Sequence, residues 1–277
     1  MKIVILGSSG FIGSAINETF SKNHTVICVD KVKKEIDNFV EYDLLNDIES
    51  IGAFENEDLF ANVDVIIHCA SILATNHNFD SMKLLYDNLR ITENVVRIAK
   101  KLNPKSLINF STIGVYPALD GVYSEESGIK PSSNHECLYS LSKFCSEELF
   151  SFFLKDSGIR VINLRLSQTI GEGMRSDRIY SIMLDELKNK NTITVWGKGE
   201  RVSSFISIDY LLETIEKIVK TQNLDGVYNV SQECMSYLEL AENILKDYGN
   251  EESKIILLEK GNKSKVYITA EKLNSLI

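Results

Sequence analysis

The 277-residue chain lacks the features that mark metal-binding, nucleic-acid-binding or membrane proteins. Its five cysteines are odd in number and contain no CxxC spacing, and its four histidines are scattered without ligand spacing, so neither disulfides nor a metal site is expected. The net charge is −9 without any basic block, which argues against a nucleic-acid partner. No apolar run approaches the roughly 18 residues of a membrane span. Met1 leads directly into a strand-like run, so we expect no signal peptide, a cytoplasmic location and free thiols.

The strongest local pattern is a glycine-rich turn near the N-terminus, in the sequence KIVILGSSGFIG at residues 2–13. The run IVIL is continuously apolar, which is typical of a strand buried on both faces of a parallel sheet. Apolar residues then recur at helical spacing as far as Phe20, so the turn joins a strand to a helix. Gly7, Gly10 and Gly13 lack a Cβ atom, which permits a tight turn and close approach of a pyrophosphate to the backbone. The pattern predicts a dinucleotide site.

Asp30 supports that prediction, because it lies 23 positions after Gly7 (30 − 7) and ends a second buried strand over residues 25–29. In dinucleotide-binding folds an acid about 20 positions after the turn binds the adenosine ribose. By itself Asp30 fits a turn-initiating acid equally well; beside the glycine turn, the ribose-binding interpretation is favoured. A carboxylate repels a 2′-phosphate, so NAD is expected over NADP, a preference weakened by the lysines that begin at Lys31.

Short buried strands alternate with helices as far as Lys220, which predicts an α/β fold with a parallel sheet and right-handed crossovers. We expect strands at 3–6, 25–29, 39–42, 63–69, 105–111 and 159–164, and helices at 79–101, 138–155, 179–190 and 210–220. Residues 47–60 are expected to form a loosely helical connection, and 112–131 a loop. Shorter elements follow, including strands at 192–196 and 203–208. Without repeats or a low-complexity linker, these later elements predict a second lobe and not a separately linked domain.

Tyr139 and Lys143 are four residues apart on one expected helix, so their side chains lie on the same face. An ammonium group near a phenol favours the phenolate, and lowering the phenol pKa by about 3 units requires roughly 4 kcal/mol. Taken alone, such a pair is more often a chance surface arrangement than a catalytic one.

Thr112 changes this balance, because it directly follows the expected strand at 105–111. Open parallel sheets bind ligands at that edge. The Thr112 hydroxyl is therefore expected to contact a substrate oxygen and the Tyr139 phenol. Ser111 is a competing candidate, and capping of the strand end is the alternative role for Thr112.

Together these segments resemble the extended short-chain dehydrogenase/reductase family, in its NAD-dependent epimerase/dehydratase branch that acts on nucleotide sugars. The likeness extends from Met1 to about Lys220 and lies in the segments GSSGFIG (7–13), HCAS (68–71), STIGVYP (111–117), YSLSK (139–143), LRLSQTIGEG (164–173) and WGKGERVSSFISID (196–209). The resemblance implies a Rossmann-type doubly wound parallel sheet with a smaller α/β substrate-binding lobe. It implies an NAD-binding domain over 1–165, rejoined by 203–230, and a substrate-binding lobe from 166–202 and 231–277.

The resemblance also implies which residues form the site. The catalytic residues are Thr112, Tyr139 and Lys143. The cofactor-binding residues are Gly7, Ser9, Gly10, Phe11, Ile12, Gly13, Asp30, Lys31, Asp43, Leu44, Cys69, Ala70, Ser71, Asn88, Tyr139 and Lys143.

Several positions depart from the family pattern. Ile113 and Gly114 stand where dehydratases carry Asp-Glu, so a 4,6-dehydratase is disfavoured. Gln168 replaces an asparagine that contacts the nucleotide diphosphate, and Ser203 replaces the usual diphosphate arginine. Any one basic side chain offered as a substitute is more often simply solvated. The expected substrate-binding residues are Thr112, Gln168, Arg175, Arg178 and Arg201, with Lys198 as a further candidate. After TAEKLNSL the family's last helix is expected to be lacking.

The expected function is that of an NAD-dependent nucleoside-diphosphate-sugar epimerase. Tyr139 takes the proton of a sugar hydroxyl during hydride transfer, Lys143 holds the cofactor ribose and keeps the phenolate charged, and Thr112 polarises the same oxygen. A ketoreductase that uses external NAD(P)H and a non-catalytic NAD-binding sensor are the alternatives. The expected partners are a nucleotide sugar and a second copy of the chain, which docks through the helices at 79–101 and 138–155.

Overall fold

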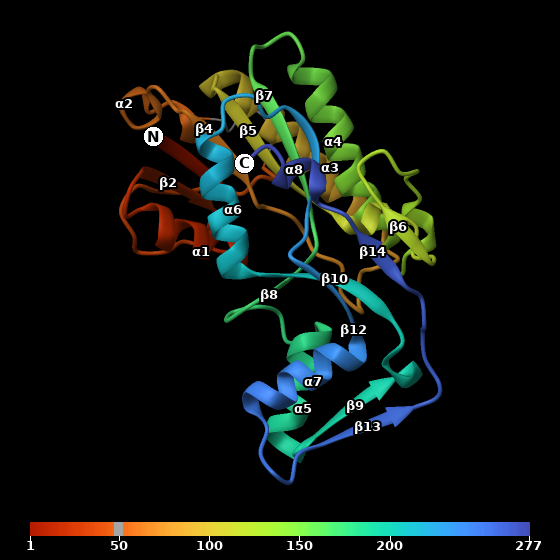
Figure 1. Ribbon diagram of the computed structural model, residues 1–277. Helices are drawn as coiled ribbons and strands as arrows, with labels where there is room; N and C mark the ends of the chain where they lie inside the picture. The colour runs from red at the N-terminus through yellow and green to blue at the C-terminus, as the bar shows by residue number, and fades with distance from the viewer. Residues whose placement is uncertain (47–51) are drawn as a thin grey trace.

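A seven-stranded parallel sheet forms the centre of the larger of two lobes in the computed structural model, which describes residues 1–46 and 52–277 (Figure 1). The strand order is β11-β7-β5-β4-β1-β2-β3. This order confirms the doubly wound, Rossmann-type sheet, with the reversal of strand order between β1 and β4. The strands are β1 (Lys2–Leu6), β2 (Thr25–Asp30), β3 (Phe39–Glu41), β4 (Val65–His68), β5 (Ser106–Thr112), β7 (Arg160–Leu166) and β11 (Gly226–Val230).

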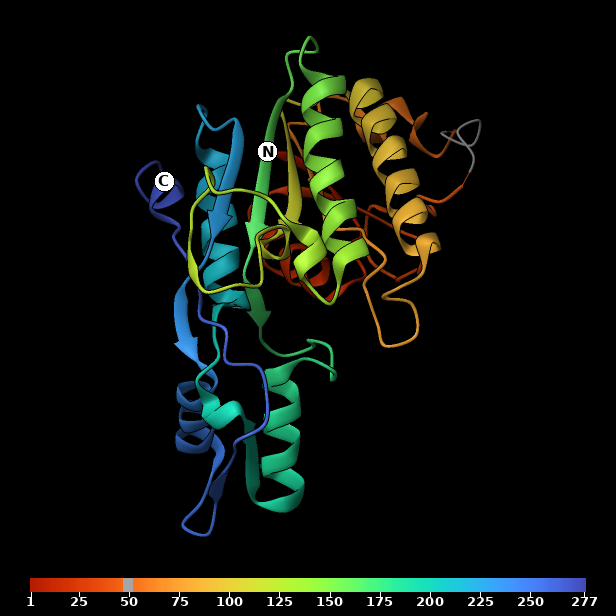
Figure 2. The same cartoon turned by 90° about the vertical axis from the view of Figure 1, so that its right-hand side faces the viewer.

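Helices cover both faces of this sheet. Helices α1 (Phe11–Phe20) and α6 (Ile208–Lys220) pack together on one face, whereas α3 (Met82–Leu102) and α4 (Cys137–Leu154) pack together on the other (Figure 2). The short α2 (Glu57–Phe60) packs Phe60 into the second of these cores. Residues 47–51 of the connection expected at 47–60 lie outside the described residues.

Strand β1 shows why its continuous apolar run predicts a doubly covered sheet. Ile3 and Ile5 point into the core beneath α1 and α6, and Val4 and Leu6 point into the core beneath α3 and α4. All four side chains are fully buried. Because successive side chains alternate between the faces of a strand, a strand covered on both sides has no position that faces solvent.

The smaller lobe has its own core and two small sheets. Helices α5 (Ile179–Lys190) and α7 (Tyr237–Tyr248) pack against the parallel pair β9 (Thr192–Trp196) and β13 (Lys254–Leu258). The strands β8 (Gln168–Ile170), β10 (Val202–Ser207) and β12 (Glu233–Ser236) form a three-stranded sheet between the lobes (Figure 1). Residues 208–230 contribute α6 and β11 to the large lobe, whereas β10 belongs to the intervening sheet.

The C-terminal segment departs from the expected division at 231–277, because its end returns to the large lobe. Strand β14 (Val266–Ile268) pairs with β6 (Gly121–Tyr123), a strand inside the segment expected to be a loop. After it, α8 (Glu271–Asn274) places Leu273 in the core under α1 and α6. Three-residue strands are too short to show a period in sequence, which is why neither was expected.

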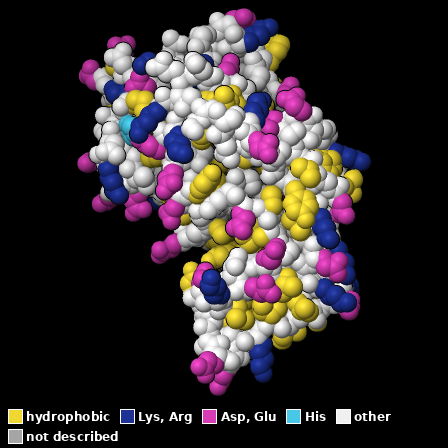
Figure 3. Space-filling view, in the orientation of Figure 1, with side chains coloured by type: hydrophobic (Ala, Val, Ile, Leu, Met, Phe, Trp, Pro, Cys, Tyr) yellow, Lys and Arg dark blue, Asp and Glu magenta, His cyan; other side chains and the backbone are white. Residues whose placement is uncertain are grey.

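Three features of the structure concern nucleic-acid binding, membrane insertion and metal binding. Acidic and basic side chains are interspersed over the face in Figure 3, without a continuous basic stripe. Within residues 1–46 and 52–277, no helix is both long and apolar enough to cross a membrane. In the same part of the chain, no cluster of three or more His, Cys, Asp or Glu side chains is arranged to hold a metal ion.

Candidate active site

A cavity of about 410 Å³ opens at the carboxyl ends of the large sheet's central strands. Its lining includes Gly7 after β1, Asp30 at the end of β2, Ala70 after β4, Thr112 at the end of β5 and Gln168 after β7. The cavity therefore lies where the strand order reverses, and the segment before α5 closes it from the side of the smaller lobe. Open α/β sheets bind their ligands at this position.

The three glycines of the turn differ in role: two are needed for folding and one leaves room for a ligand. Gly7 has φ +88°, and a Cβ there would lie 2.5 Å from the backbone nitrogen of Ala70. A Cβ at Gly13 would collide with the carbonyl oxygen of Gly7. Gly10, by contrast, has ordinary backbone angles, and its nearest neighbour would be the Gly7 oxygen at 3.5 Å. Gly7 and Gly13 are thus required by packing, whereas Gly10 leaves open space at the N-terminus of α1, where a phosphate would bind.

Asp30 is fixed at the rim of the cavity by backbone donors. Its two oxygens accept hydrogen bonds from the N–H groups of Ser9 and Val32, each at 2.9 Å. A carboxylate has about four acceptor sites, so the oxygens retain capacity for ribose hydroxyls. Ser9 does not line the cavity but ties the glycine turn to β2, also through its hydroxyl to the Val32 carbonyl at 2.8 Å.

The remaining expected cofactor residues fall into two groups. Asn88 does not line the cavity but lies behind the residues that do. Its side chain accepts a hydrogen bond from Ile72 N at 2.8 Å and donates one to Ile72 O at 2.9 Å, and these two bonds fix the segment after β4. The others line the cavity directly and are Phe11, Ile12, Lys31, Asp43, Leu44, Cys69 and Ser71.

Tyr139 and Lys143 both line the cavity from the first turns of α4. Burial raises the pKa of Tyr139 to about 12, partly offset by a hydrogen bond with Ser71. Burial also lowers the pKa of Lys143 to about 8, against the opposing influence of Cys69 and Glu147. The expected lowering of the phenol pKa is therefore not found in the protein alone, because desolvation of the phenolate outweighs the nearby positive charges.

Thr112 also lines the cavity, where its hydroxyl oxygen accepts a hydrogen bond from Gly114 N at 3.1 Å. Its O–H is then left to donate elsewhere. Asn134 holds the same loop by donating to the carbonyls of Gly114 and Tyr116, both at 2.8 Å. The competing Ser111 has its hydroxyl engaged, because it donates to the buried carboxylate of Glu147. The side chain free to meet a ligand is that of Thr112.

Two of the expected arginines line the cavity from the segment before α5. Arg175 donates to the Ala74 carbonyl at 3.0 Å and pairs with Asp177, and its second terminal nitrogen is buried without a partner among the described residues. Arg178 forms an ion pair with Glu136 at 2.9 Å. Both guanidinium groups therefore reach the cavity beside Tyr139, whose pKa they lower.

The structure does not place the other basic candidates at the cavity. The Arg201 guanidinium lies 4.9 Å from the centre of the Tyr237 ring, and Lys198 pairs with Glu259 at 2.7 Å. Gln168 does line the cavity and donates to the Ser203 hydroxyl at 2.7 Å. Two of the positions that depart from the family pattern, Gln168 and Ser203, are thus paired with each other.

Sequence reasoning missed several lining residues. Glu136 precedes Tyr139 by three positions and raises its pKa, but no pattern marks it. Tyr42 and Ser167 each carry a buried hydroxyl without a partner among the described residues. Both adjoin predicted residues, Asp43 and Gln168, and that adjacency was the one available signal.

The arrangement fits a dinucleotide, judged on the residues present. Gly10 leaves a cradle that a Cβ would fill, Asp30 offers carboxylate oxygens at the rim, and no side chain among the described residues accepts a hydrogen bond from the Lys143 ammonium. A buried ammonium without an acceptor is costly, so a ligand hydroxyl there would relieve the cost.

Comparison with known proteins gives the same family. The sequence profile of the NAD dependent epimerase/dehydratase family matches residues 3–231. Over 275 residues the chain is 26% identical to dTDP-D-glucose 4,6-dehydratase of Dictyostelium discoideum, which covers 88% of this chain and 61% of that protein. The chain therefore spans less than two thirds of that relative's length.

Two further likenesses differ in their named reactions. The dTDP-4-dehydro-6-deoxyglucose reductase of Escherichia coli is 25% identical over 262 residues, with 87% of this chain and 80% of that protein covered. The crystal structure of UDP-glucuronic acid 4-epimerase from Bacillus cereus in complex with NAD matches with a TM-score of 0.81. That match has 22% identity and covers 100% of this chain and 92% of the other. At this identity the structural match establishes the fold.

The glycine turn gives a matched pair of variants. Gly10→Ala is expected to change the free energy of unfolding by less than about 1 kcal/mol while weakening NAD binding at least tenfold, because the methyl group enters the space left for a phosphate. Gly13→Ala is expected to destabilise by about 1–3 kcal/mol through overpacking. Urea unfolding and calorimetric NAD titration measure the two effects. Equal NAD affinity in wild type and Gly10→Ala contradicts the assignment.

The burial of Lys143 predicts a pH-dependent stability. Its pKa falls from 10.5 to about 8 on folding, so between these values the unfolded chain binds more protons and the wild-type free energy of unfolding rises with pH. Lys143→Met should remove this rise and stabilise the protein at pH 7 by up to about 3 kcal/mol. Urea unfolding between pH 7 and 10.5, with the exposed Lys188→Met as control, measures it. A Lys143→Met curve parallel to wild type would refute the account.

Proposed function

The chain belongs to the NAD-dependent epimerase/dehydratase family, and from that premise we propose that it is an epimerase of nucleoside-diphosphate sugars. The cofactor of this family is NAD. The observation that carries the proposal is one cavity lined by the glycine turn and Asp30 together with Thr112, Tyr139 and Lys143. Such a cavity joins a dinucleotide site to a base and two polar side chains that can act on one hydroxyl group.

The residues that would hold NAD are those of the glycine turn, Asp30, the segment after β4 and Lys143. Asp30 at the rim favours NAD over NADP, because its carboxylate would face the adenosine ribose and repel a phosphate there. When bound, NAD supplies a hydride acceptor that can return the hydride to the same carbon.

Tyr139 is the proposed general base for a sugar hydroxyl. Its phenol is protonated in the protein alone, since burial raises its pKa to about 12. Positive charge near the oxygen is therefore what makes the phenolate accessible. Arg178 and Arg175 lower the Tyr139 pKa, and Lys143 lines the same cavity one helical turn away. Thr112 donates to the substrate oxygen and Lys143 binds the cofactor ribose. In an epimerase the keto sugar then turns over, and Tyr139 returns the proton.

The diphosphate is proposed to bind the two arginines before α5. One buried nitrogen of Arg175 has no partner within residues 1–46 and 52–277, which supports this, because a buried cationic donor gains most from an anionic acceptor. Gln168, hydrogen-bonded to Ser203, offers a further polar contact on the same side.

The loop after Thr112 supports an epimerase over a dehydratase. Ile113 and Gly114 follow Thr112 and carry no carboxylate, and a Cβ at Gly114 would lie 2.6 Å from the Ser140 hydroxyl oxygen, so a larger side chain would require that hydroxyl to move. The second candidate is a 4-ketoreductase, which would use the same Thr112, Tyr139 and Lys143 for half of the cycle. The likeness to the E. coli reductase supports the ketoreductase as this second candidate. A non-catalytic NAD-binding sensor is the alternative of another class.

Removing one phenol oxygen tests the proposed chemistry. Tyr139→Phe is expected to lower turnover of nucleoside-diphosphate sugars by about 10²–10⁴-fold, the usual worth of a positioned general base, with NAD binding within a fewfold of wild type. Tyr267→Phe, at a tyrosine 39% exposed on β14 and outside the cavity lining, is the matched control and should leave turnover unchanged. Product analysis by chromatography measures both. Turnover by Tyr139→Phe equal to that of wild type would contradict the assignment of Tyr139 as the general base, whereas no turnover by wild type would favour the non-catalytic sensor.

The pair of helices α3 and α4 is the proposed docking site for a second copy of the chain. Met82 and Tyr86 are exposed at the start of α3, and Phe152 and Phe153 are exposed at the end of α4, where Lys155 and Lys100 lie over their rings. Phe152→Glu is expected to separate the two copies, because a carboxylate would be desolvated in the contact. Light scattering should give the mass of two chains for wild type and of one for the variant. A wild-type monomer ends this proposal.

A further inference from the structure

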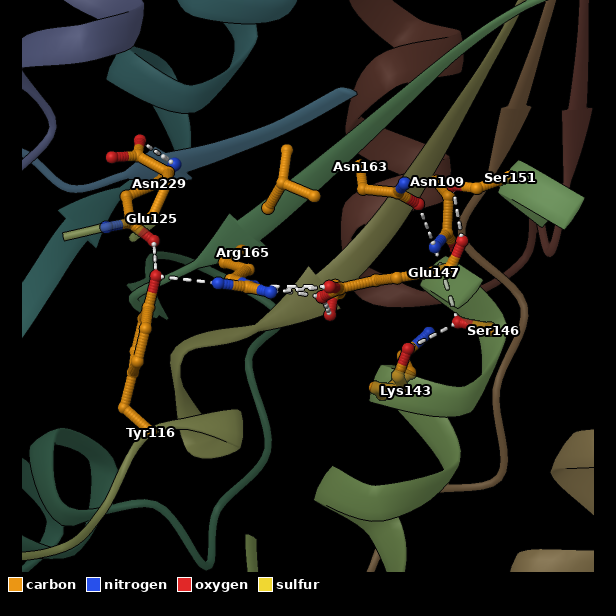
Figure 4. A network of polar contacts seen from close by, with 12 residues as sticks. Asn109, Tyr116, Glu125, Lys143, Ser146, Glu147, Ser151, Asn163, Arg165 and Asn229 are labelled. Atoms are coloured by element: carbon orange, nitrogen blue, oxygen red, sulfur yellow. Dashed lines mark hydrogen bonds and ion pairs between the residues drawn. The ribbon is translucent and has the colours of Figure 1, made fainter. Parts of the chain in front are cut away.

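Directly behind the catalytic residues lies an ion pair that is almost completely buried. Glu147 of α4 is 1% exposed and Arg165 of β7 is 4% exposed. The Arg165 guanidinium donates to both carboxylate oxygens of Glu147, with a shortest distance of 2.7 Å (Figure 4). Neither side chain lines the cavity. Two ions withdrawn from water in this way require close mutual pairing and further hydrogen bonds.

The further hydrogen bonds join this pair to the strand that carries Thr112. The Ser111 hydroxyl donates to the Glu147 carboxylate, so β5 and β7 are both tied to one side chain of α4. Glu147 stands four residues after Lys143, one turn further along the same helix (Figure 4). One carboxylate therefore connects the three elements that supply Thr112, Lys143 and the start of the substrate-side segment.

The network continues from Arg165 towards the C-terminal segment. Arg165 donates to the Tyr116 hydroxyl at 2.9 Å, and Tyr116 donates to the Asn229 side chain at 2.8 Å (Figure 4). Asn229 in turn donates to the Thr269 carbonyl at 3.0 Å. The returning end of the chain is thus fixed to the same polar network as the catalytic helix.

We propose that Glu147 is a positioning residue: it holds α4, β5 and β7 in one register, so that Thr112 and Lys143 face the same point of the cavity. The inference rests on the proposed function, since it assigns Glu147 a part in the reaction at that same site.

The charged groups around Lys143 predict a change in the pH dependence of activity, which a purely structural role of Glu147 would not produce. His68 and Cys69 face Lys143 from the end of β4, Tyr139 and Glu147 share its helix, and Arg165 stands beyond Glu147. Glu147 raises the Lys143 pKa against the effect of burial. Without the carboxylate, Lys143 loses its proton at a lower pH, and activity that requires the ammonium is lost there.

The test compares Glu147→Gln, which keeps the shape and removes the charge, with Glu148→Gln, at an exposed glutamate on the same helix. For Glu147→Gln we expect kcat to fall at least tenfold, with KM for the sugar within about threefold. The loss of activity on the alkaline side should move to lower pH by about one unit or more, the usual effect of an opposite charge nearby. NAD affinity, measured by calorimetry across the same pH range without sugar, should move in parallel. Glu148→Gln should match wild type in all three.

A second variant covers the case in which Glu147→Gln does not fold, because that change leaves Arg165 buried without its partner. Glu147→Met combined with Arg165→Met removes both charges, an exchange that proteins often tolerate in stability. We expect it to fold, as judged by circular dichroism, and to show the same alkaline shift. A folded variant with wild-type kcat and pH profiles overturns the proposal. If wild type turns over no nucleotide sugar, the proposed function fails, and the pH dependence of NAD affinity alone decides the role of Glu147.

Discussion

The burial of one ammonium group is the constraint on which the rest of the structure depends. Lys143 is 5% exposed at the reversal of strand order in a parallel sheet, and burial lowers its pKa to about 8. A charge in this position costs stability. Cys69 and Glu147 oppose the effect of burial on the Lys143 pKa, and Glu147 is itself paired with Arg165. In the proposed account, the ion pair behind the site fixes the register of α4 against the sheet, and so keeps that ammonium within reach of a ligand.

The same burial explains why the Tyr139 phenol needs nearby positive charge in order to form a phenolate. Tyr139 stands in the same low-dielectric wall, and its pKa is raised where the ammonium's is lowered, since desolvation disfavours whichever form is charged. Arg175 and Arg178 come from the substrate side and lower the Tyr139 pKa, whereas Glu136 raises it. The protonation of Tyr139 is therefore set jointly by both lobes, and a bound ligand that adds positive charge would shift it further towards the phenolate.

The sequence could predict the features that short local patterns determine. The apolar run of β1, the glycine turn and the position of Asp30 after β2 specify their own geometry, and parallel strands bring Thr112 and Tyr139 to one edge. Three kinds of feature could not be read in this way. The pairing of β6 with β14 joins two three-residue strands remote in sequence. The distance of Arg201 from the cavity depends on how the smaller lobe packs, and the direction of the Tyr139 pKa depends on burial, which no spacing records.

The central claim is that this cavity interconverts sugar epimers with a cofactor that is regenerated in each cycle. The most direct measurement incubates the purified wild-type protein and NAD with nucleoside-diphosphate hexoses, and follows sugar products by chromatography and reduced cofactor by absorbance in the same sample. The account predicts that either epimer is converted to the same equilibrium mixture, with no net change in reduced cofactor. Stoichiometric consumption of NADH with a 4-keto sugar, and no interconversion of epimers, would contradict it and establish a ketoreductase.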